Sequence, residues 1–127
     1  MVREMSITVY GIPNCDTVRK ARGWLDGLGL DYRFHDYKKA GIEPPKLREW
    51  VDARGWEALL NRRGPTFRKL PEGDRTDLDA EKAIRLMCAN PSAIKRPVVE
   101  YDHEDGRGLL VGFDAQEWST TLGGSLT

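Results

Sequence analysis

The sequence predicts an α/β protein with a four-stranded mixed sheet and a helical region inserted between the two halves of that sheet. Three observations support this: the chain begins with a strand–helix–strand pattern, its middle is mainly helical, and it ends with a strand–strand–helix pattern. At 127 residues it is long enough for one domain with a substantial core. We expect a single domain over residues 1–127, with the sheet core at 6–37 and 94–122 and the helical insertion at 43–91.

The first part of the chain has the pattern of a βαβ unit. Ile7–Tyr10 is a short apolar run, typical of a buried strand. Apolar residues then recur with the spacing of one helix face, at Val18, Ala21, Leu25 and Leu28. Gly29 is the expected end of this helix, and alternation over Leu30–His35 predicts a half-exposed second strand. The two strands should therefore be parallel, with a right-handed crossover.

The middle of the chain predicts helices separated by a loop. Pro44-Pro45 opens a helical segment, whereas residues 61–75 contain glycines, prolines and several basic residues and are expected to form a basic loop. Thr76 and Asp79 resemble a capping box at the start of a further helix, which should end at Asn90 because a proline follows.

The end of the chain predicts a hairpin and a last helix. Pro97–Tyr101 and Leu109–Phe113 are the expected antiparallel strands, Asp114 caps the helix, and Gly123-Gly124 ends it. The complete order, βαβ then helices then ββα, is the connectivity of a thioredoxin-like sheet. In open α/β structures, ligands collect where the helix after the first strand begins.

Cys15 lies at that place, after a Gly-Ile-Pro-Asn turn. The free N–H groups of a helix start favour a thiolate, which is the nucleophilic form of cysteine. Asn14 is a good residue for starting the helix. Arg19, one turn on, would support the thiolate and Asp16 would oppose it, and the side-chain directions decide between them. We interpret Cys15 as a reactive thiol rather than a buried structural cysteine.

The sequence contains no C-x-x-C motif, because Val18 occupies the fourth position. A single attacking thiol cannot resolve its own mixed disulfide. Cys88 shares an apolar helical face with Ala80, Ile84 and Met87, so we interpret it as a core residue. An external thiol is therefore the expected resolving group.

Among the basic residues, Arg63 and Arg96 are candidates for binding carboxylates or oxyanions, because a planar guanidinium binds such groups with two parallel hydrogen bonds. The other loop arginines are interpreted as solvated. His35 and His103 have no ligand-spaced partners, so we predict no metal site and no bound cofactor.

Composition excludes several classes of function. The 20 acidic and 20 basic residues balance, which argues against non-specific binding to nucleic acid or to a membrane surface. No apolar run approaches the roughly 20 residues that span a bilayer, and the first ten residues do not resemble a signal peptide. Two distant cysteines do not form a disulfide framework. We expect a cytoplasmic protein with reduced thiols.

Several segments together resemble the ArsC family: N-C-D-T-V-R-K-A, N-R-R-G-P-T-F-R-K-L, and I-K-R-P-V-V with L-L-V-G-F. The resemblance runs from about Ile7 to Trp118. The family comprises glutaredoxin-coupled arsenate reductases, the Spx transcriptional regulators and a branch of small reductases typified by YffB. The phrases Y-R-F-H-D-Y and G-W-E-A-L-L-N-R-R-G are most similar to the YffB-like branch.

The resemblance implies roles for individual residues. Cys15 matches the family's nucleophile, and Arg19 matches the arginine of its C-x-x-x-R motif. Arg63, or its neighbour Arg62, matches the first oxyanion-binding arginine. Arg96 matches the arginine of the R-P pair, whose proline is the cis-proline that faces the cysteine in thioredoxin-like folds. The residues expected to bind substrate or glutathione are therefore Asn14, Arg19, Arg63, Arg96 and Pro97.

Three positions depart from the family's patterns. Gly11 stands where arsenate reductases carry a histidine, and Gly112 stands where they carry a third arginine. Both weaken the case for arsenate reduction, because a tetrahedral oxyanion needs several cationic partners. Val18 removes the C-x-x-C switch of Spx regulators.

Three hypotheses for the function follow. The first is a cytosolic monothiol reductase that uses Cys15 as nucleophile, with glutathione as co-substrate or glutaredoxin as partner. The second is a glutaredoxin-coupled arsenate reductase, and the third is a non-catalytic Spx-like module that binds another protein. The neutral net charge and the missing switch cysteine count against the third.

Overall fold

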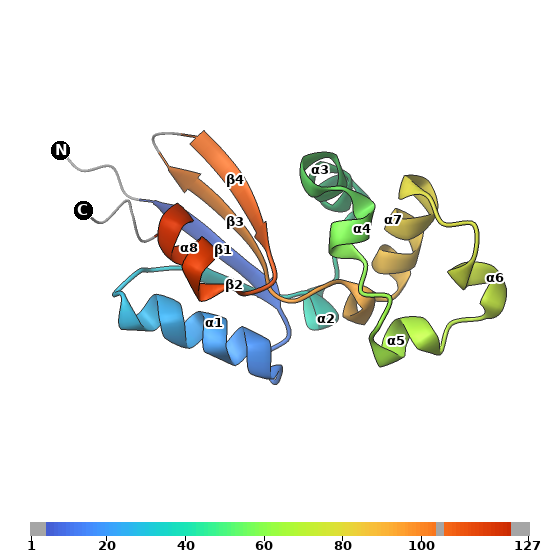
Figure 1. The fold of residues 1–127 in the computed structure, drawn as a ribbon, viewed down its shortest axis with the longest axis horizontal. Helices are drawn as coiled ribbons and strands as arrows, with labels where there is room; N and C mark the ends of the chain where they lie inside the picture. Colours follow the sequence, from blue (N-terminus) through green and yellow to red (C-terminus); the bar gives the residue numbers. More distant parts are fainter. Residues whose placement is uncertain (1–4, 104–105, 123–127) are drawn as a thin grey trace. The chain divides into compact units, whose positions relative to one another are not determined.

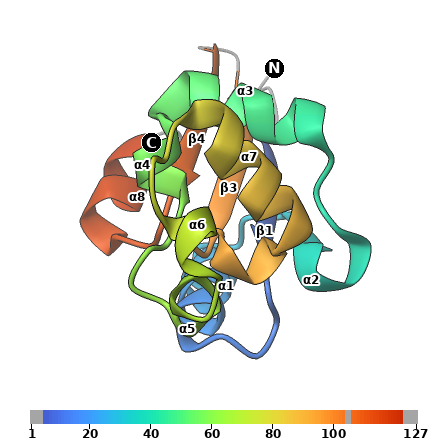
Figure 2. The same cartoon turned by 90° about the vertical axis from the view of Figure 1, so that its right-hand side faces the viewer.

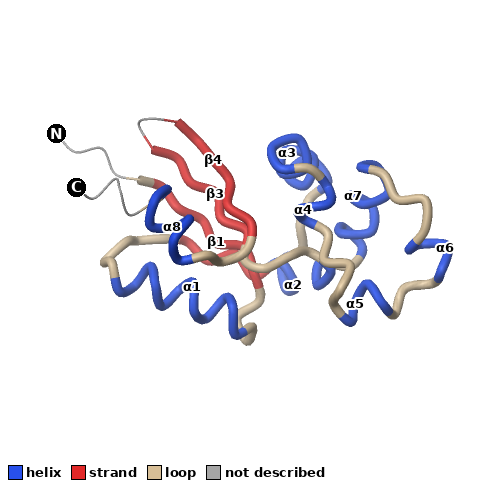
Figure 3. The backbone as a smooth tube through the Cα atoms, in the orientation of Figure 1, coloured by secondary structure: helices blue, strands red, loops and turns tan. Residues whose placement is uncertain are grey.

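A computed structural model describes residues 5–103 and 106–122 of the chain. The backbone divides into two compact units, which are treated separately below (Figure 1). Unit 1 consists of Met1–Asp36 and Arg96–Thr127, and unit 2 of Tyr37–Lys95. Figure 3 shows that every described strand lies in unit 1 and that unit 2 is helical. The assignment of both units to one domain stays a prediction.

The described part of unit 1 contains the sheet and two helices. Its elements are β1 (Ser6–Gly11), α1 (Asp16–Gly27), β2 (Arg33–Asp36), β3 (Val98–His103), β4 (Gly106–Val111) and α8 (Ala115–Thr121). The strand order is β2-β1-β3-β4. Strands β1 and β2 are parallel, whereas β3 is antiparallel to both β1 and β4. This is the predicted thioredoxin-like mixed sheet, and the predicted βαβ unit and hairpin are both confirmed.

Helices α1 and α8 pack on one face of the sheet. The residues of this shared core are Ile7, Val9, Ala21, Leu25, Val99, Leu110, Trp118 and Leu122. Trp118 also meets Trp24 and Phe113 edge to face, with ring centroids 5.8 and 4.8 Å away. Such edge contacts add to the apolar burial that holds α1 and α8 on the sheet.

Leu28 does not lie on the helix face on which its spacing placed it. Helix α1 ends at Gly27, and Leu28 is 41% exposed. The chain then reverses at Gly29, whose φ of +69° lies in the left-handed region that glycine adopts without strain. Leu30 packs against the core cluster instead.

Strand boundaries differ from the predicted ones because pairing with neighbours sets them. Strand β2 begins at Arg33, opposite Thr8, and not at Leu30. Strand β4 begins at Gly106 and ends at Val111, in register with β3. The local alternation of residues indicates a strand but does not say where its partner starts.

Unit 2 is built from short helices around its own core. Its elements are α2 (Tyr37–Ala40), α3 (Pro44–Arg54), α4 (Trp56–Leu59), α5 (Pro65–Arg68), α6 (Glu72–Arg75), α7 (Ala80–Ala89) and the 3₁₀ turn η1 (Pro91–Ala93). Figure 2 shows α7 alongside α3. The largest fully buried side chains of this unit are Tyr37, Leu47, Trp50, Leu59, Leu60, Met87 and Ile94.

Two predictions in unit 2 need correction. Residues 61–75 are not a continuous loop, because Pro65 occupies the first turn of α5 and Pro71 is the N-cap of α6, positions that suit proline. The cap of α7 is Asp79 alone, whose carboxylate accepts the Lys82 N–H at 2.8 Å. Thr76 instead donates its hydroxyl to the Glu72 carbonyl.

The last helix begins as predicted, with the Asp114 carboxylate accepting the N–H groups of Gln116 and Glu117. Its predicted end, Gly123-Gly124, lies outside the described residues. Within residues 5–103 and 106–122, the helices are all too short or too polar to cross a membrane.

Candidate active site around Cys15

Cys15 is the N-cap of α1. The Cys15 N–H donates to the Ile12 carbonyl at 3.2 Å, which closes the turn, and the Cys15 carbonyl accepts the Arg19 N–H at 2.9 Å, which begins the helix. Its φ of −95° and ψ of 130° are the extended values typical of a cap. The predicted position of Cys15 is confirmed. Asn14 is not the capping residue and lies exposed in the turn.

The environment of Cys15 favours the thiolate. Burial raises the pKa of its thiol, but hydrogen bonding from the Val18 N–H, the Arg96 side chain and the Thr17 N–H outweighs burial, so that the pKa is lowered from its ordinary value. The positive charge of Arg96 acts in the same direction. The side chain is half-buried, so that it remains reachable by another molecule. A low pKa with partial exposure is the condition for a reactive cysteine.

Arg19 does not support the Cys15 thiolate, although its spacing in the sequence suggested that it would. Its guanidinium pairs with the Asp16 carboxylate at 2.5 Å on the exposed side of the helix. The two residues that were expected to act on Cys15 in opposite directions thus bind each other. The arginine that acts on the thiol is Arg96, from the other end of the chain.

Arg96 is held at the start of β3 beside Pro97. The Arg96–Pro97 peptide bond is cis, which confirms the expectation for this proline. Pro97 is buried, and its carbonyl accepts the Gly112 N–H at 2.8 Å from the end of β4. Unit 1 therefore brings Cys15 and Arg96 together and fixes the backbone that carries the arginine.

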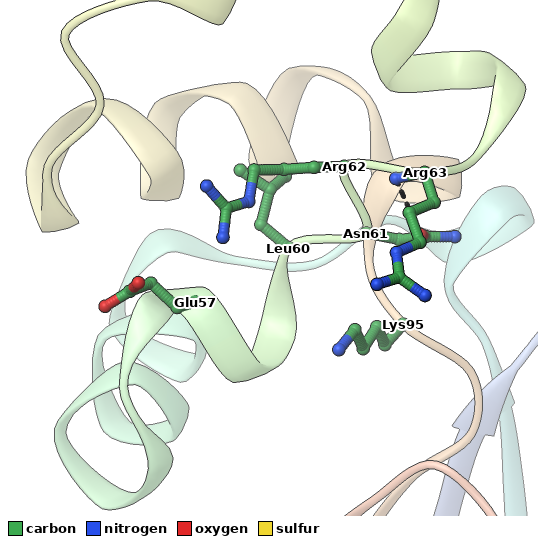
Figure 4. A pocket seen from close by; sticks show the side chains of 6 residues that line it. All are labelled: Glu57, Leu60, Asn61, Arg62, Arg63 and Lys95. Carbon is green, nitrogen blue, oxygen red and sulfur yellow. Dashed lines mark hydrogen bonds between the residues drawn. The ribbon is translucent and has the colours of Figure 1, made fainter.

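The two neighbouring arginines of unit 2 have different surroundings. The Arg62 guanidinium lies over the Trp56 ring, 5.4 Å from its centroid. Both arginines line the same pocket, together with Lys95, and the Arg62 side chain extends away from those of Arg63 and Lys95 (Figure 4). The assignment of the oxyanion-binding position to Arg63 or Arg62 stays a prediction.

Sequence reasoning did not select Lys95 or Asn61, which line the same pocket. Lys95 precedes Arg96 in the I-K-R-P segment, and Asn61 opens the N-R-R-G segment. Each segment also carries an arginine that the sequence predicts to bind an anion. The proximity of the two segments is a tertiary contact, and no spacing in the sequence signals it.

Cys88 is a free, half-buried thiol on α7. Burial and the negative charge of Glu43 raise its pKa, so its environment favours the protonated form. Its neighbours Met87 and Ile84 are buried in the core, whereas Cys88 itself lies at the edge of it. Among the described residues, no three His, Cys, Asp or Glu side chains gather in a way that could hold a metal ion.

Comparison with known proteins agrees with this fold. Residues 10–121 match the ArsC family, and the chain belongs to this family of arsenate reductase-like proteins. A solved structure of the protein YffB has a TM-score of 0.84 and 50% identity, covering 91% of this chain and 98% of that one. The resemblance to the YffB-like branch is therefore confirmed.

Two further relatives are similar over nearly the whole chain. An arsenate reductase (ArsC) related protein from Brucella melitensis is 48% identical with a TM-score of 0.71, covering 94% of this chain and 97% of that one. An uncharacterized protein of Haemophilus influenzae is 39% identical over 116 residues, which cover 91% of this chain and 98% of the relative.

Proposed function

We propose that this protein is a thiol-dependent oxidoreductase in which Cys15 is the nucleophile and glutathione is the reductant. The observation that carries the proposal is the environment of Cys15, whose pKa is lowered at a helix start beside Arg96 while its side chain stays half-exposed. An ordinary structural cysteine needs neither the arginine nor the exposure. Proposed binding residues for substrate or glutathione are Asn14, Arg19, Arg63, Arg96 and Pro97.

The proposed reaction is two successive thiol–disulfide exchanges. The Cys15 thiolate attacks one sulfur of a disulfide substrate, the S–S bond breaks, and the leaving thiolate takes a proton from solvent. One glutathione thiolate then attacks the mixed disulfide on Cys15 and becomes bonded to the former substrate sulfur, so that the Cys15 thiolate is released. If that sulfur belongs to glutathione, the substrate is a mixed disulfide of glutathione, one further glutathione thiol is consumed, and the products are the substrate thiol released in the first step and glutathione disulfide.

A resolving thiol from outside the chain is part of this proposal. Val18 occupies the position of the second cysteine in a C-x-x-C motif and is fully buried. Cys88 has a raised pKa, which disfavours the attacking form. Glutathione is abundant and reduced in the cytoplasm, which is where we propose that the protein acts; glutaredoxin is the alternative source of the thiol.

Arsenate reduction is the second candidate function. The relative from Brucella melitensis, an arsenate reductase (ArsC) related protein, favours it. Gly11 and Gly112 count against it, because neither offers a side chain to a compact oxyanion. A non-catalytic Spx-like binding module is the third candidate, and the lowered pKa of Cys15 gives it no support, since docking alone requires no activated thiol.

The test is a thiol titration of Cys15 by alkylation rate against pH, combined with mass spectrometry after incubation with glutathione disulfide. The proposal expects a Cys15 thiol that ionises below the ordinary range and one glutathione adduct per chain, which reduced glutathione then removes. The Cys15→Ser chain is the control and should form no adduct. Ordinary reactivity of Cys15 and no adduct in the unaltered protein would refute the proposal.

A further inference from the structure

We propose that Arg63 and Lys95 form a carboxylate-binding site of unit 2, with Lys95 as a binding residue in its own right. The pocket has a volume of about 370 Å³ and is lined by Glu57, Leu60, Asn61, Arg62, Arg63 and Lys95. The proposal rests on the proposed function for the identity of the ligand, a glutathione carboxylate, and on this pocket for the site.

Two backbone segments are tied together beneath the pocket. Leu60 and Ile94 form an isolated antiparallel bridge. On either side of it, the Asn61 N–H donates to the Ala93 carbonyl and the Lys95 N–H donates to the Leu59 carbonyl, both at 2.8 Å. The bridge fixes the backbone of Lys95 beside Leu59, and Arg63 follows in the turn two residues after the bonded Asn61.

Asn61 fixes the backbone from which Arg63 projects. Its side-chain oxygen accepts the Arg63 N–H at 3.1 Å. A Cβ atom at Gly64 would lie 2.7 Å from the Asn61 side-chain nitrogen, so a side chain at this position would require the Asn61 amide to move. The glycine of the N-R-R-G segment is therefore explained by the position of Asn61.

The charges of the pocket favour an anion. Three cations and one carboxylate line it. The Arg62 guanidinium stacks over Trp56, whereas the Arg63 and Lys95 side chains lie near each other on the opposite side of the pocket (Figure 4). Among residues 5–103 and 106–122, no side chain forms an ion pair with Arg63 or with Lys95. Two neighbouring cations that repel each other are stabilised by a shared anion.

The shape of the pair suits a carboxylate. A guanidinium offers two parallel N–H groups to the two oxygens, and an ammonium adds a point charge from a flexible stem. The unit around the pocket is itself basic, with 13 Lys and Arg against 9 Asp and Glu in Tyr37–Lys95. The neutral total charge of the chain conceals this excess.

The experiment uses the full chain with Cys15→Ser, so that no covalent step occurs, and S-methylglutathione, which keeps both carboxylates and has no free thiol. The dissociation constant and the amide shifts of Asn61, Arg63 and Lys95 are measured by NMR. K95Q should weaken binding about tenfold, the scale of one charged hydrogen bond. K69Q is the matched control, because Lys69 is an exposed lysine of the same unit that does not line the pocket, and it should change binding less than about twofold.

Equal effects of K95Q and K69Q would overturn the proposal, since binding would then depend on overall charge. Binding of the dimethyl ester of S-methylglutathione as tightly as the free acid would also overturn it, as would equal competition by inorganic sulfate at constant ionic strength. A Cys15 adduct without any Lys95 effect would refute this site and leave the proposed function standing. Binding of S-methylglutathione that depends on Lys95, together with no adduct on Cys15 of the unaltered protein, would support this site and refute the proposed function.

Discussion

Val18 occupies the space that a side chain at Gly11 would need. A Cβ atom built on Gly11 would lie 2.9 Å from Val18 Cγ2, with Phe34 a further 3.8 Å neighbour. Val18 is fully buried, so it cannot turn away into solvent. Gly11 stands where arsenate reductases carry a histidine, and Val18 stands where Spx regulators carry their second cysteine. Because Val18 fills the space that a side chain at Gly11 would need, the two departures belong to one packing arrangement.

The pair predicts a coupled effect on stability. Gly11→Ala should destabilise the fold by about 1–3 kcal/mol through overpacking, and Val18→Ala by about 1–3 kcal/mol through a cavity. The double variant should cost less than the sum by roughly 1 kcal/mol, because the smaller residue makes room for the added methyl. Urea denaturation of all four chains measures the coupling. Strict additivity would mean that the contact does not limit this position.

Substitution of Gly112, which stands where arsenate reductases carry a third arginine, should destabilise the fold through backbone strain. Its φ of +78° is a left-handed conformation, and a Cβ added there meets no atom within 4 Å. Gly112→Ala should therefore cost about 1–2 kcal/mol from strain alone. Gly112→Arg should cost about the same, because the cost comes from the backbone and not from crowding. A much larger loss for arginine in thermal or urea unfolding would show that space is limiting.

Gly11 and Gly112 also lead to a prediction for arsenate turnover. With glycine at both, the protein should turn over arsenate well below about 1 per second, the lower range of ordinary enzymes. A coupled assay with arsenate, glutathione and glutaredoxin measures this. Turnover at ordinary enzymatic rates would promote arsenate reduction to the leading function.

The two cysteines should respond to pH in opposite ways. The pKa of Cys15 is lowered and that of Cys88 is raised, so Cys15 should be alkylated first, with a midpoint below that of an ordinary thiol. Arg96→Gln should move the Cys15 midpoint upward. Arg107→Gln is the matched control in the same unit, since Arg107 is exposed and its ion partner among the described residues is Asp102, at 3.6 Å. Equal shifts in both variants would contradict the contact with Arg96.

The pH dependence of the free energy of unfolding should reflect the same two pKa shifts. A thiol whose pKa is lowered by folding stabilises the fold at pH values above its ordinary pKa, near 8.5, and this contribution is lost as pH falls through the folded value. Relative to Cys15→Ser, the unaltered protein should therefore gain stability from neutral to alkaline pH. The raised pKa of Cys88 acts in the opposite sense, with its contribution lost as pH rises. Unfolding curves of the two single variants across this range separate the contributions.

Activity should depend on one cysteine. Cys15→Ser should abolish reductase activity and keep the fold, because the hydroxyl preserves the size of the side chain and loses the nucleophile. Cys88→Ala should retain most activity and cost at most a few kcal/mol, the range for shortening a partly buried side chain. Assays with a mixed disulfide of glutathione measure both. A Cys88→Ala protein that accumulates the Cys15 adduct would identify Cys88 as the resolving thiol.

The sequence by itself determined the features that depend on neighbours along the chain. The run Ile7–Tyr10, the helical spacing after it and the Asp114 cap each act within a few residues, and the structure has the predicted element in each case. The position of Cys15 followed from the same local signals, because a turn and a helix start are set by backbone conformation.

Only the tertiary structure decided which charges act on which groups. Spacing suggested Arg19 as the partner of Cys15, but Arg19 pairs with Asp16 one turn away, and the thiol is contacted by Arg96 from the segment that precedes β3. In the same way, the bridge at Leu60 placed Lys95 beside Arg63. A long charged side chain pairs with whichever group lies nearest in space. Sheet pairing and backbone bridges bring together segments that are far apart in the sequence, and no local sequence pattern indicates which segments these are.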